Sequence, residues 1–267
     1  SMTDPLSRRV GRGAWRAYES LAMVLGLGFL GLLCLVWLPF AALLHPLLPR
    51  RWGQPLGRAV IMGSFRVYLR FLSLFCACRF ELSALDALRR DAPLVLVANH
   101  PSLLDVVIIA SRFPNAVCIM KAALMDNLLL GAAARLACYI PNDAPLEMVR
   151  RARQELGEGA HLLIFPEGTR TRTFPIDACT PGAGLIAGRA KVPVQTLLID
   201  FSSPYLGKAW PLFRRPELPL RVAVRVGRRF APPTDAAAFT RELESYFRGE
   251  LAATNPAGTP AARTALS

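Results

Sequence analysis

A long uncharged apolar stretch near the N-terminus constrains the fold of this chain more than any other feature of its sequence. From Leu21 to Leu44 there are 24 consecutive residues without a charged side chain. About 20 apolar residues are enough for a helix to cross the hydrocarbon core of a membrane, and this stretch is longer than the apolar part of a signal peptide. Two arrangements are compatible with it: a single spanning helix, or a bent, re-entrant pair of helices that Pro39, Pro46 and Pro49 help to break.

The charges on either side of the stretch favour the re-entrant arrangement. The stretch is preceded by Arg8, Arg9, Arg12 and Arg16 and followed by Arg50 and Arg51. Because positive residues tend to stay on the cytoplasmic side, arginines at both ends give little reason to place one end across the membrane. A buried core helix is a further alternative, but core helices are rarely so uniformly apolar over this length.

Residues 52–80 combine basic and apolar side chains in a different pattern. Arg58, Arg66 and Arg70 are interleaved with aliphatic and aromatic residues. This spacing predicts an amphipathic helix, whose basic face either lies on an anionic lipid surface or is the solvated face of a domain helix. We therefore expect two N-terminal segments: a basic one over residues 1–20 and a membrane-anchoring helical one over residues 21–80.

After Pro93 the pattern changes to short apolar runs that alternate with helical periodicity. This alternation predicts an α/β fold, in which helices flank a largely buried sheet. The expected strands are residues 94–98, 117–120, 161–165, 194–199 and 220–226, and the expected helices are residues 103–112, 122–137, 144–157, 182–190 and 235–252. We assign the α/β domain to residues 81–252 and expect residues 253–267, which are rich in Ala, Thr and Pro, to be a disordered tail.

Composition excludes several classes of protein. With 53% hydrophobic residues, the chain as a whole is not disordered. Six cysteines without a C-x-x-C pair indicate reduced thiols, and the three histidines lie too far apart for a metal site, so we expect no bound metal. The net charge of +13 raises nucleic-acid binding as an alternative. Because the sequence has no helix-turn-helix, RNA-recognition or zinc-finger signature, we expect no nucleic-acid partner.

A histidine and an aspartate follow the first predicted strand of the α/β domain, in the segment Asn99-His100-Pro101-Ser102-Leu103-Leu104-Asp105. Loops at the carboxyl ends of strands are where open α/β sheets build their sites, and a carboxylate one turn into the next helix can fold back onto the imidazole. Such a pair makes a general base for a hydroxyl group. The alternatives are a histidine held by a local carboxylate and an aspartate in the first turn of a helix. Ser102 is expected to be the N-cap of a helix that begins at Leu103, and not a nucleophile, because the chain has no G-x-S-x-G motif.

A second motif, Phe165-Pro166-Glu167-Gly168-Thr169-Arg170, follows another predicted strand. Gly168 permits a tight turn, and Arg170 and Arg172 can each hold an anion through two parallel hydrogen bonds. A phosphate group suits such a loop. The alternative is a plain turn after a strand with solvated arginines.

Together and in this order, the two motifs resemble those of the glycerolipid acyltransferase superfamily, which includes bacterial lysophosphatidic acid acyltransferases. The resemblance covers residues 94–230, with further support from Lys121 in I-M-K-A-A-L and from the segment Val192-Pro193-Val194. It implies the fold of that superfamily, with His100 as the general base and Asp105 as the partner that orients it. It also implies that the acceptor is bound by Lys121 and by the loop of Glu167, Gly168, Thr169 and Arg170.

The chain departs from the superfamily's pattern at two places where a basic residue is expected to contact the phosphate of the acceptor. The stretch from Tyr139 to Asp143 has no basic residue, and Pro181 stands before Gly182 where the pattern has a lysine. The remaining candidates are Arg170, Arg172 and Lys121. Lysophosphatidic acid is the expected acceptor, and another lysolipid or an amino-acid-linked lipid is the alternative.

The resemblance implies a membrane-bound enzyme that moves a fatty acyl group directly from a thioester to the hydroxyl of the lysolipid. The donor is acyl-CoA or acyl carrier protein, and no metal or other cofactor is expected because the thiol leaves readily. Basic residues are expected to attract anionic lipid and an acidic donor, among them Arg214, Arg215, Arg221, Arg225, Arg228 and Arg229. We expect the enzyme at the cytoplasmic face of the inner (plasma) membrane. The alternative is a catalytically silent membrane-anchored scaffold with the same fold.

Overall fold

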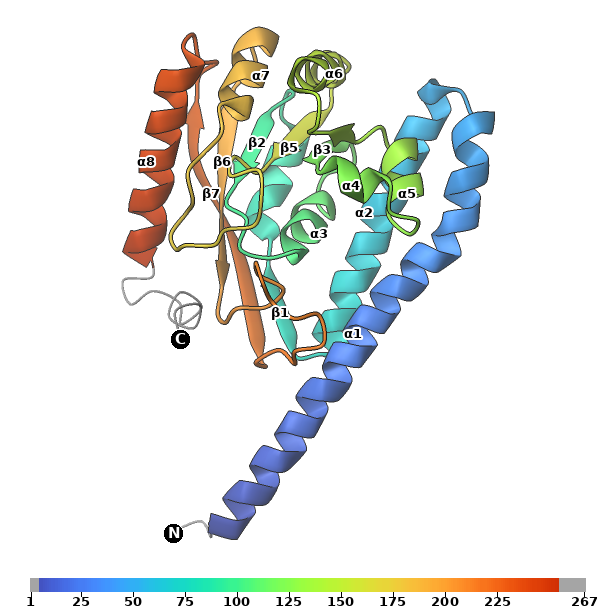
Figure 1. Ribbon diagram of the computed structural model, residues 1–267, viewed down its shortest axis with the longest axis vertical. Helices are drawn as coiled ribbons and strands as arrows, with labels where there is room; N and C mark the ends of the chain where they lie inside the picture. Colours follow the sequence, from blue (N-terminus) through green and yellow to red (C-terminus); the bar gives the residue numbers. More distant parts are fainter. Residues whose placement is uncertain (1–4, 255–267) are drawn as a thin grey trace.

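Two long N-terminal helices precede a seven-stranded sheet in the computed structural model, which describes residues 5–254 and, for side chains, residue 10 onward. Figure 1 shows the two helices side by side along one flank of the sheet domain, with the N-terminal end of the first projecting beyond the rest. Helices flank the sheet, and an apolar helix stands at the N-terminus. The predicted α/β fold is therefore confirmed.

The first helix, α1 (Pro5–Leu47), contains the whole apolar stretch together with most of the basic segment before it. It passes Pro39 and Pro46 without a break. The chain turns only at residue 48 and Pro49, and α2 (Arg50–Phe75) runs back along α1. The apolar stretch therefore lies in one helix, and of the three prolines expected to help break a re-entrant pair only Pro49 stands at the turn.

Packing holds α1 on both sides of Pro39. The Phe29 ring stacks on the Phe71 ring of α2, with centroids 4.2 Å apart, and Ala41 packs against α5 (Gly131–Leu136). Only 17% of the most apolar window of α1 is buried, which argues against a core helix. Among the described helices, α1 alone is long and apolar enough to cross a membrane, judged by length and composition.

The second helix is amphipathic, as predicted, but two of its three predicted basic residues bind the domain. The Arg58 side chain is 3% exposed and its Nη2 lies 2.7 Å from Glu155 Oε2. Arg66 Nε donates to the carbonyl oxygen of Ser111 over 2.7 Å. Arg70 remains exposed. The prediction of a basic face directed wholly at lipid or solvent is therefore wrong, because α2 uses these arginines to attach itself to the sheet domain.

The sheet has the strand order β1-β7-β6-β2-β5-β3-β4, and all neighbours are parallel except β6 and β7. All four residues of the central strand β2 are buried. Helices on both faces exclude water from such a strand, which is why it reads as a continuous apolar run. The strands are β1 (Cys78–Glu81), β2 (Val95–Ala98), β3 (Ala116–Met120), β4 (Ile140–Pro141), β5 (His161–Ile164), β6 (Val194–Phe201) and β7 (Leu220–Phe230).

The helices of the domain form two groups. In one group α7 adjoins both α6 and α8, and in the other α2 contacts both α3 and α5. Right-handed crossovers place α3 on one face of the sheet and α6 and α7 on the other, because the chain crosses the sheet in opposite directions in the two halves. The remaining elements are η1 (Ser83–Arg90), α3 (Leu104–Ala110), α4 (Ala122–Met125), α6 (Pro145–Gly157), α7 (Gly182–Ala190) and α8 (Ala236–Thr254). Helix α8 includes the first two residues of the predicted tail, and residues 255–267 lie outside the described residues.

The five predicted strands are all present, with small shifts at their ends. The single helix predicted over residues 122–137 is wrong, because a turn separates α4 from α5. In that turn Asn127 Oδ1 accepts the N–H groups of Leu129 and Leu130, and such side-chain bonds compete with those of a continuous helix. The short strands β1 and β4 were not predicted, since two to four residues carry too little periodicity.

Candidate active site

Four loops meet at one edge of the sheet because they follow neighbouring parallel strands. In sheet order these strands are β6, β2, β5 and β3. His100 lies in the loop after β2, residues 167–172 lie in the loop after β5, and Lys121 directly follows β3. The loop after β6 contains Lys208. The carboxyl edge of an open α/β sheet is where ligands bind, so the two motifs lie at a candidate site.

His100 and Asp105 are in direct contact. The imidazole Nδ1 lies 2.8 Å from Asp105 Oδ2, and the same oxygen accepts the N–H of Ser102 over 2.8 Å. When Asp105 is ionised, Nδ1 carries a proton and donates it, which leaves Nε2 as an acceptor. The imidazole also stacks on the Phe165 ring with centroids 3.9 Å apart. These contacts fix both the tautomer and the plane of the ring.

The Asp105 side chain is 0% exposed. Burial raises the pKa of its carboxyl group, and the hydrogen bond and charge of His100, with smaller contributions from Ser102 and Arg170, act in the opposite direction. A buried carboxylate beside an imidazole favours the imidazolium that forms when Nε2 takes up a proton. Ser102 Oγ accepts the N–H of Leu104 over 3.1 Å. Because α3 begins at Leu104, one residue later than predicted, its N-cap is Leu103 and not Ser102.

Glu167 ties the loop after β2 to the loop after β5. It is buried, and its Oε1 accepts hydrogen bonds from the His100 N–H (3.2 Å) and from Thr171 Oγ1 (2.8 Å). Its Oε2 accepts the N–H of Asp177 over 2.9 Å. Burial raises the pKa of the Glu167 carboxyl group, whereas these hydrogen bonds lower it. Both oxygens are thus engaged by the protein, and the carboxylate holds the backbone next to His100.

Gly168 and Arg170 shape the rest of this loop. Gly168 has φ +68°, a left-handed conformation that glycine adopts readily. Arg170 Nη1 donates to the carbonyl oxygens of Leu206 (2.9 Å) and Gly207 (2.7 Å), which joins the loop after β5 to the loop after β6. Partial burial lowers the pKa of Arg170, and the nearby charge of Asp105 raises it. The guanidinium therefore lies close to the His–Asp pair.

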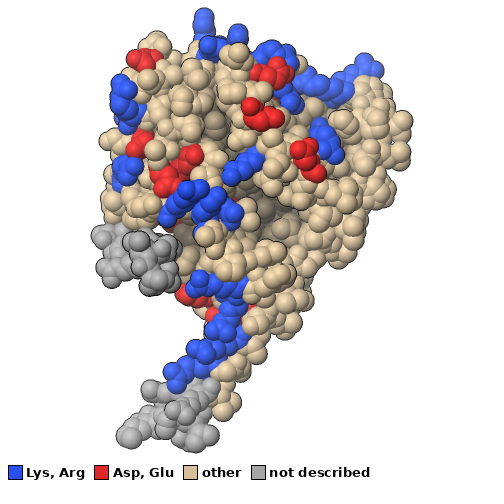
Figure 2. Space-filling model, in the orientation of Figure 1, with Lys and Arg blue, Asp and Glu red and all other residues tan. Residues whose placement is uncertain are grey.

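Three further cations accompany Arg170 at this edge: Lys121, Arg172 and Lys208. The Lys208 Nζ lies 3.1 Å from Thr169 Oγ1. The pKa of Lys208 is lowered, first by the charge of Lys121 and then by desolvation and the charges of Arg172 and Arg170. In the described part of the chain, none of these four cations has a carboxylate within ion-pair distance. Figure 2 shows several Lys and Arg side chains beside a hollow in the face that is turned to the viewer. The arrangement suits an anion.

The motifs do not predict Lys208. It stands in an irregular segment between β6 and β7 and belongs to no recognisable pattern. The signal that could have found it is the pairing of β6 with β2, because the loop after a strand next to β2 must reach the edge that holds His100.

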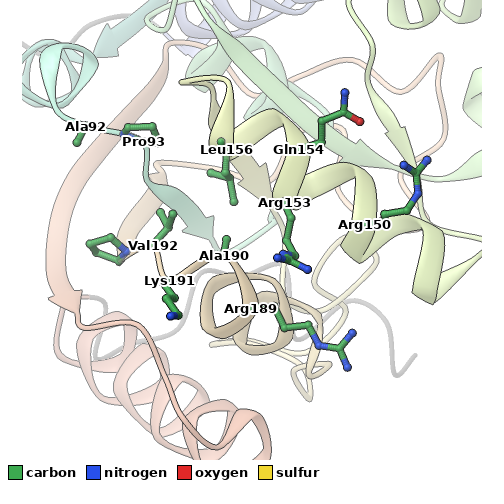
Figure 3. A pocket seen from close by; sticks show the side chains of 12 residues that line it. Ala92, Pro93, Arg150, Arg153, Gln154, Leu156, Arg189, Ala190, Lys191 and Val192 are labelled. Carbon is green, nitrogen blue, oxygen red and sulfur yellow. The ribbon is translucent and has the colours of Figure 1, made fainter.

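A cavity of about 640 Å³ lies at the opposite edge of the sheet. Pro93 and Pro193, which precede β2 and β6, line it together with several basic side chains (Figure 3). Two of these, Arg189 and Lys191, stand at the C-terminal end of α7, where the unpaired carbonyl groups favour positive charge. This cavity is therefore remote from His100. The charges of Arg189 and Lys191 stabilise the C-terminal end of α7.

The arginines near the C-terminus do not form the free positive patch predicted from the sequence. Four of the six lie 2.6 to 3.5 Å from carboxylates in the pairs Arg215–Glu19, Arg225–Asp200, Arg228–Glu242 and Arg229–Asp91. Arg214 lies over the Trp210 ring, 4.4 Å from its centroid. The acidic partners come from distant parts of the sequence, so the compensation becomes visible only in the fold.

Comparison with known proteins supports the resemblance stated above. Residues 79–200 match the acyltransferase family. A 1-acyl-sn-glycerol-3-phosphate acyltransferase of Pseudomonas aeruginosa is 24% identical over 198 residues, which cover 72% of this chain and 74% of the relative. The chloroplast protein of that name from Brassica napus, BAT2, is 26% identical over 134 residues, 48% of this chain. The chain spans only 39% of the length of the Brassica relative.

A solved structure has the same fold. The 1-acyl-sn-glycerophosphate acyltransferase PlsC of Thermotoga maritima superposes with a TM-score of 0.68, covering 89% of this chain and 98% of that one, at 17% sequence identity. At this coverage the similarity of fold extends well beyond residues 79–200. Residues 79–200 therefore match the acyltransferase family, and the chain resembles the glycerolipid acyltransferases in both sequence and fold, as its two motifs predicted.

Proposed function

We propose that the chain is an O-acyltransferase that moves a fatty acyl group from an acyl thioester to the hydroxyl group of lysophosphatidic acid. The observation that carries this proposal is the 2.8 Å contact between His100 Nδ1 and the buried Asp105, which leaves Nε2 as a base. Four cations without carboxylate partners among the described residues adjoin this pair and suit a phosphate. The names of the relatives support the same acceptor.

In the proposed reaction, His100 acts as a general base and then as a general acid. Nε2 removes the proton of the acceptor hydroxyl while its oxygen bonds to the carbonyl carbon of the thioester. When the tetrahedral intermediate collapses, the carbon–sulfur bond breaks and the imidazolium returns the proton to the departing thiolate. Asp105 stabilises the imidazolium between the two steps. The products are an ester and a free thiol, and no acyl-enzyme forms.

The donor is acyl-CoA or acyl carrier protein, and the proposed route uses neither a metal nor another cofactor. Glu167 acts as a positioning residue, because both of its oxygens hold the backbone around His100. Lys121 and the loop of Gly168, Thr169 and Arg170 surround the place of the acceptor phosphate.

Acyl transfer measured with a panel of acceptors tests this function. Labelled acyl-CoA and acyl carrier protein are offered separately, in detergent, with lysophosphatidic acid, other lysophospholipids and an amino-acid-linked lysolipid as acceptors. Lysophosphatidic acid should give the highest kcat/KM. A clear preference for another acceptor would show that the phosphate assignment is wrong. If the folded protein transferred no acyl group from either donor, the proposed acyltransferase activity would be wrong.

We also propose that the exposed face of α1 lies in the cytoplasmic leaflet of the inner membrane, with the sheet domain on the water side. Leu32, Leu35, Val36 and Leu43 share this face and are 53 to 60% exposed. The opposite face of α1 packs on α2 and α5, so the helix cannot be surrounded by lipid unless those contacts break. A helix held along its side in this way suits a protein that lies in one leaflet.

Replacing Val36 by aspartate is expected to lower the partition coefficient onto lipid vesicles at least tenfold, because a carboxylate in the hydrocarbon core costs about 2.5–3.5 kcal/mol. Val36 is 58% exposed, so the change leaves the packing intact. The matched control is Leu146→Asp, which places the same charge at an 80% exposed position on α6 and should bind as the wild type does. Vesicle flotation measures both. If the two variants bound vesicles equally, α1 would not be the part of the protein that contacts the membrane.

A further inference from the structure

We propose that Lys208 is a specificity-determining residue of the acceptor site, where it binds the phosphate of the acceptor together with Lys121. This inference rests on the proposed function, because it names a further residue that recognises the same substrate. Lys208 lies outside residues 79–200, the part of the chain that matches the acyltransferase family. The superfamily's pattern has basic residues for the acceptor phosphate in the stretch from Tyr139 to Asp143 and at Pro181, and this chain has none there. Lys208 supplies a cation in their place.

The loop after β6 is tied to both loops that carry the motifs. The carbonyl oxygen of Leu206 accepts the N–H of Leu103, in the loop after β2, over 3.1 Å. Arg170, in the loop after β5, donates to the same oxygen and to that of Gly207. Three hydrogen bonds thus fix the two residues immediately before Lys208. Its side chain is thereby placed beside the second motif.

The backbone on either side of Lys208 has an unusual conformation. Leu206 has φ +54° and Ala209 has φ +61°, a region that residues other than glycine rarely adopt. Such conformations persist only where the surrounding contacts hold them, and they are concentrated at ligand-binding sites. Here Leu103 and Arg170 hold the first of the two residues. A plain connection between β6 and β7 would not require this shape.

The Lys208 ammonium group keeps donors for a ligand. It has three N–H groups, of which Thr169 Oγ1 accepts one. Lys121 directly follows β3 at the same edge of the sheet, and its charge is the first cause of the lowered pKa of Lys208. Neither has a carboxylate partner in the part of the chain that the structure describes. Two like charges in this position repel each other until an anion neutralises both, and a phosphate monoester carries enough charge to do so.

Replacing Lys208 by glutamine is expected to raise KM for lysophosphatidic acid about tenfold to hundredfold, with kcat within about threefold. The reason is that hydrogen bonds to a charged group are lost equally from the ground state and the transition state. For monoacylglycerol, which offers hydroxyl groups without a phosphate, the same change should leave kcat/KM as in the wild type. Lys208→Arg keeps the charge and should restore most of the lost affinity.

The matched control is Lys191→Gln, which removes an equal charge at the opposite edge of the sheet (Figure 3). It should leave the kinetics with both acceptors unchanged. An unchanged KM of Lys208→Gln for lysophosphatidic acid would overturn the proposal. An equal loss with both acceptors, accompanied by a lower Tm, would also overturn it, because Lys208 would then serve the structure of the loop.

A binding measurement separates failure of this inference from failure of the proposed function. Glycerol 3-phosphate is titrated calorimetrically into the full chain in detergent, with glycerol as the neutral control. If the wild type binds glycerol 3-phosphate and Lys208→Gln binds it about tenfold more weakly, the assignment of Lys208 stands even without transfer to lysophosphatidic acid. The assignment would be overturned, whatever the activity, if the two proteins bound glycerol 3-phosphate equally. It would also be overturned if the wild type bound glycerol 3-phosphate no more tightly than glycerol.

Discussion

Replacing His100 by alanine is expected to lower kcat/KM for acyl transfer by about a thousandfold. A positioned general base contributes roughly 10² to 10⁴ to a rate, and no other described group is placed to replace it. The His100 ring is held on two sides, by Asp105 at 2.8 Å and by the Phe165 ring at 3.9 Å between centroids. Replacing His100 therefore removes both the base and the two contacts that orient it. Single-turnover and steady-state transfer of a labelled acyl group measure the effect.

Ser102→Ala is the control for this experiment, because Ser102 is the neighbouring hydroxyl that an acyl-enzyme route would use. Its Oγ accepts the N–H of Leu104, the first residue of α3, whereas its N–H, which the substitution keeps, is the group that donates to Asp105. We expect it to lose less than about tenfold in kcat/KM, the effect of one lost hydrogen bond at the start of the helix. If Ser102→Ala were as inactive as His100→Ala, direct transfer would be the wrong mechanism.

Replacing Arg58 by methionine is expected to lower the free energy of unfolding by about 1.5–3 kcal/mol, because it removes the buried cation that is hydrogen-bonded to the buried Glu155 carboxylate. The Arg58 and Glu155 side chains are 3% and 5% exposed and lie 2.7 Å apart. Arg58 also donates to Asn115 Oδ1 over 2.6 Å and to the carbonyl oxygen of Ala137 over 3.0 Å. Asn115 Oδ1 and the carbonyl oxygen of Ala137 lose this donor, whereas Glu155 keeps Arg50 and Gln54, each at 2.6 Å. Denaturant unfolding in detergent, followed by tryptophan fluorescence, measures the change.

Arg150→Met is the matched control, since Arg150 also pairs with a glutamate, Glu147, but on the exposed surface of α6. Exposed ion pairs contribute little, so its unfolding should be indistinguishable from that of the wild type. A value for Arg58→Met within the error of the Arg150→Met value would mean that the Arg58 pair does not hold α2 to the domain.

The parts of the fold that follow from local pattern could be predicted. The residues of β2 and β5 are buried throughout, so β2 is a continuous apolar run and β5 is apolar after His161. The helical periods before and after β5 mark α6 and α7 closely. Elements that depend on distant partners could not be predicted. Strand β1 has only four residues and exists because it pairs with β7, far along the chain.

The same division applies to the candidate site. His100, Asp105 and Arg170 lie in segments with a recognisable order of residues, and the structure brings them to one edge. Lys208 carries no such local signal, because its position depends on the pairing of β6 with β2. Neutralisation of Arg229 by Asp91 was likewise invisible in the sequence, because strand order and not chain order makes them neighbours.

The attachment of α2 to the sheet domain has a consequence for attempts to shorten the chain to the sheet domain alone. Tyr68 and Leu72 of α2 are 1% and 4% exposed and belong to the same apolar core as the sheet. Cutting the chain before β1 would uncover that core and leave Glu155 in an apolar surface without Arg58. The tolerance of a chain to truncation follows from what the removed backbone buries. The two N-terminal helices are thus part of the folding unit, and substitutions on the exposed outer face of α1 can change its surface without uncovering that core.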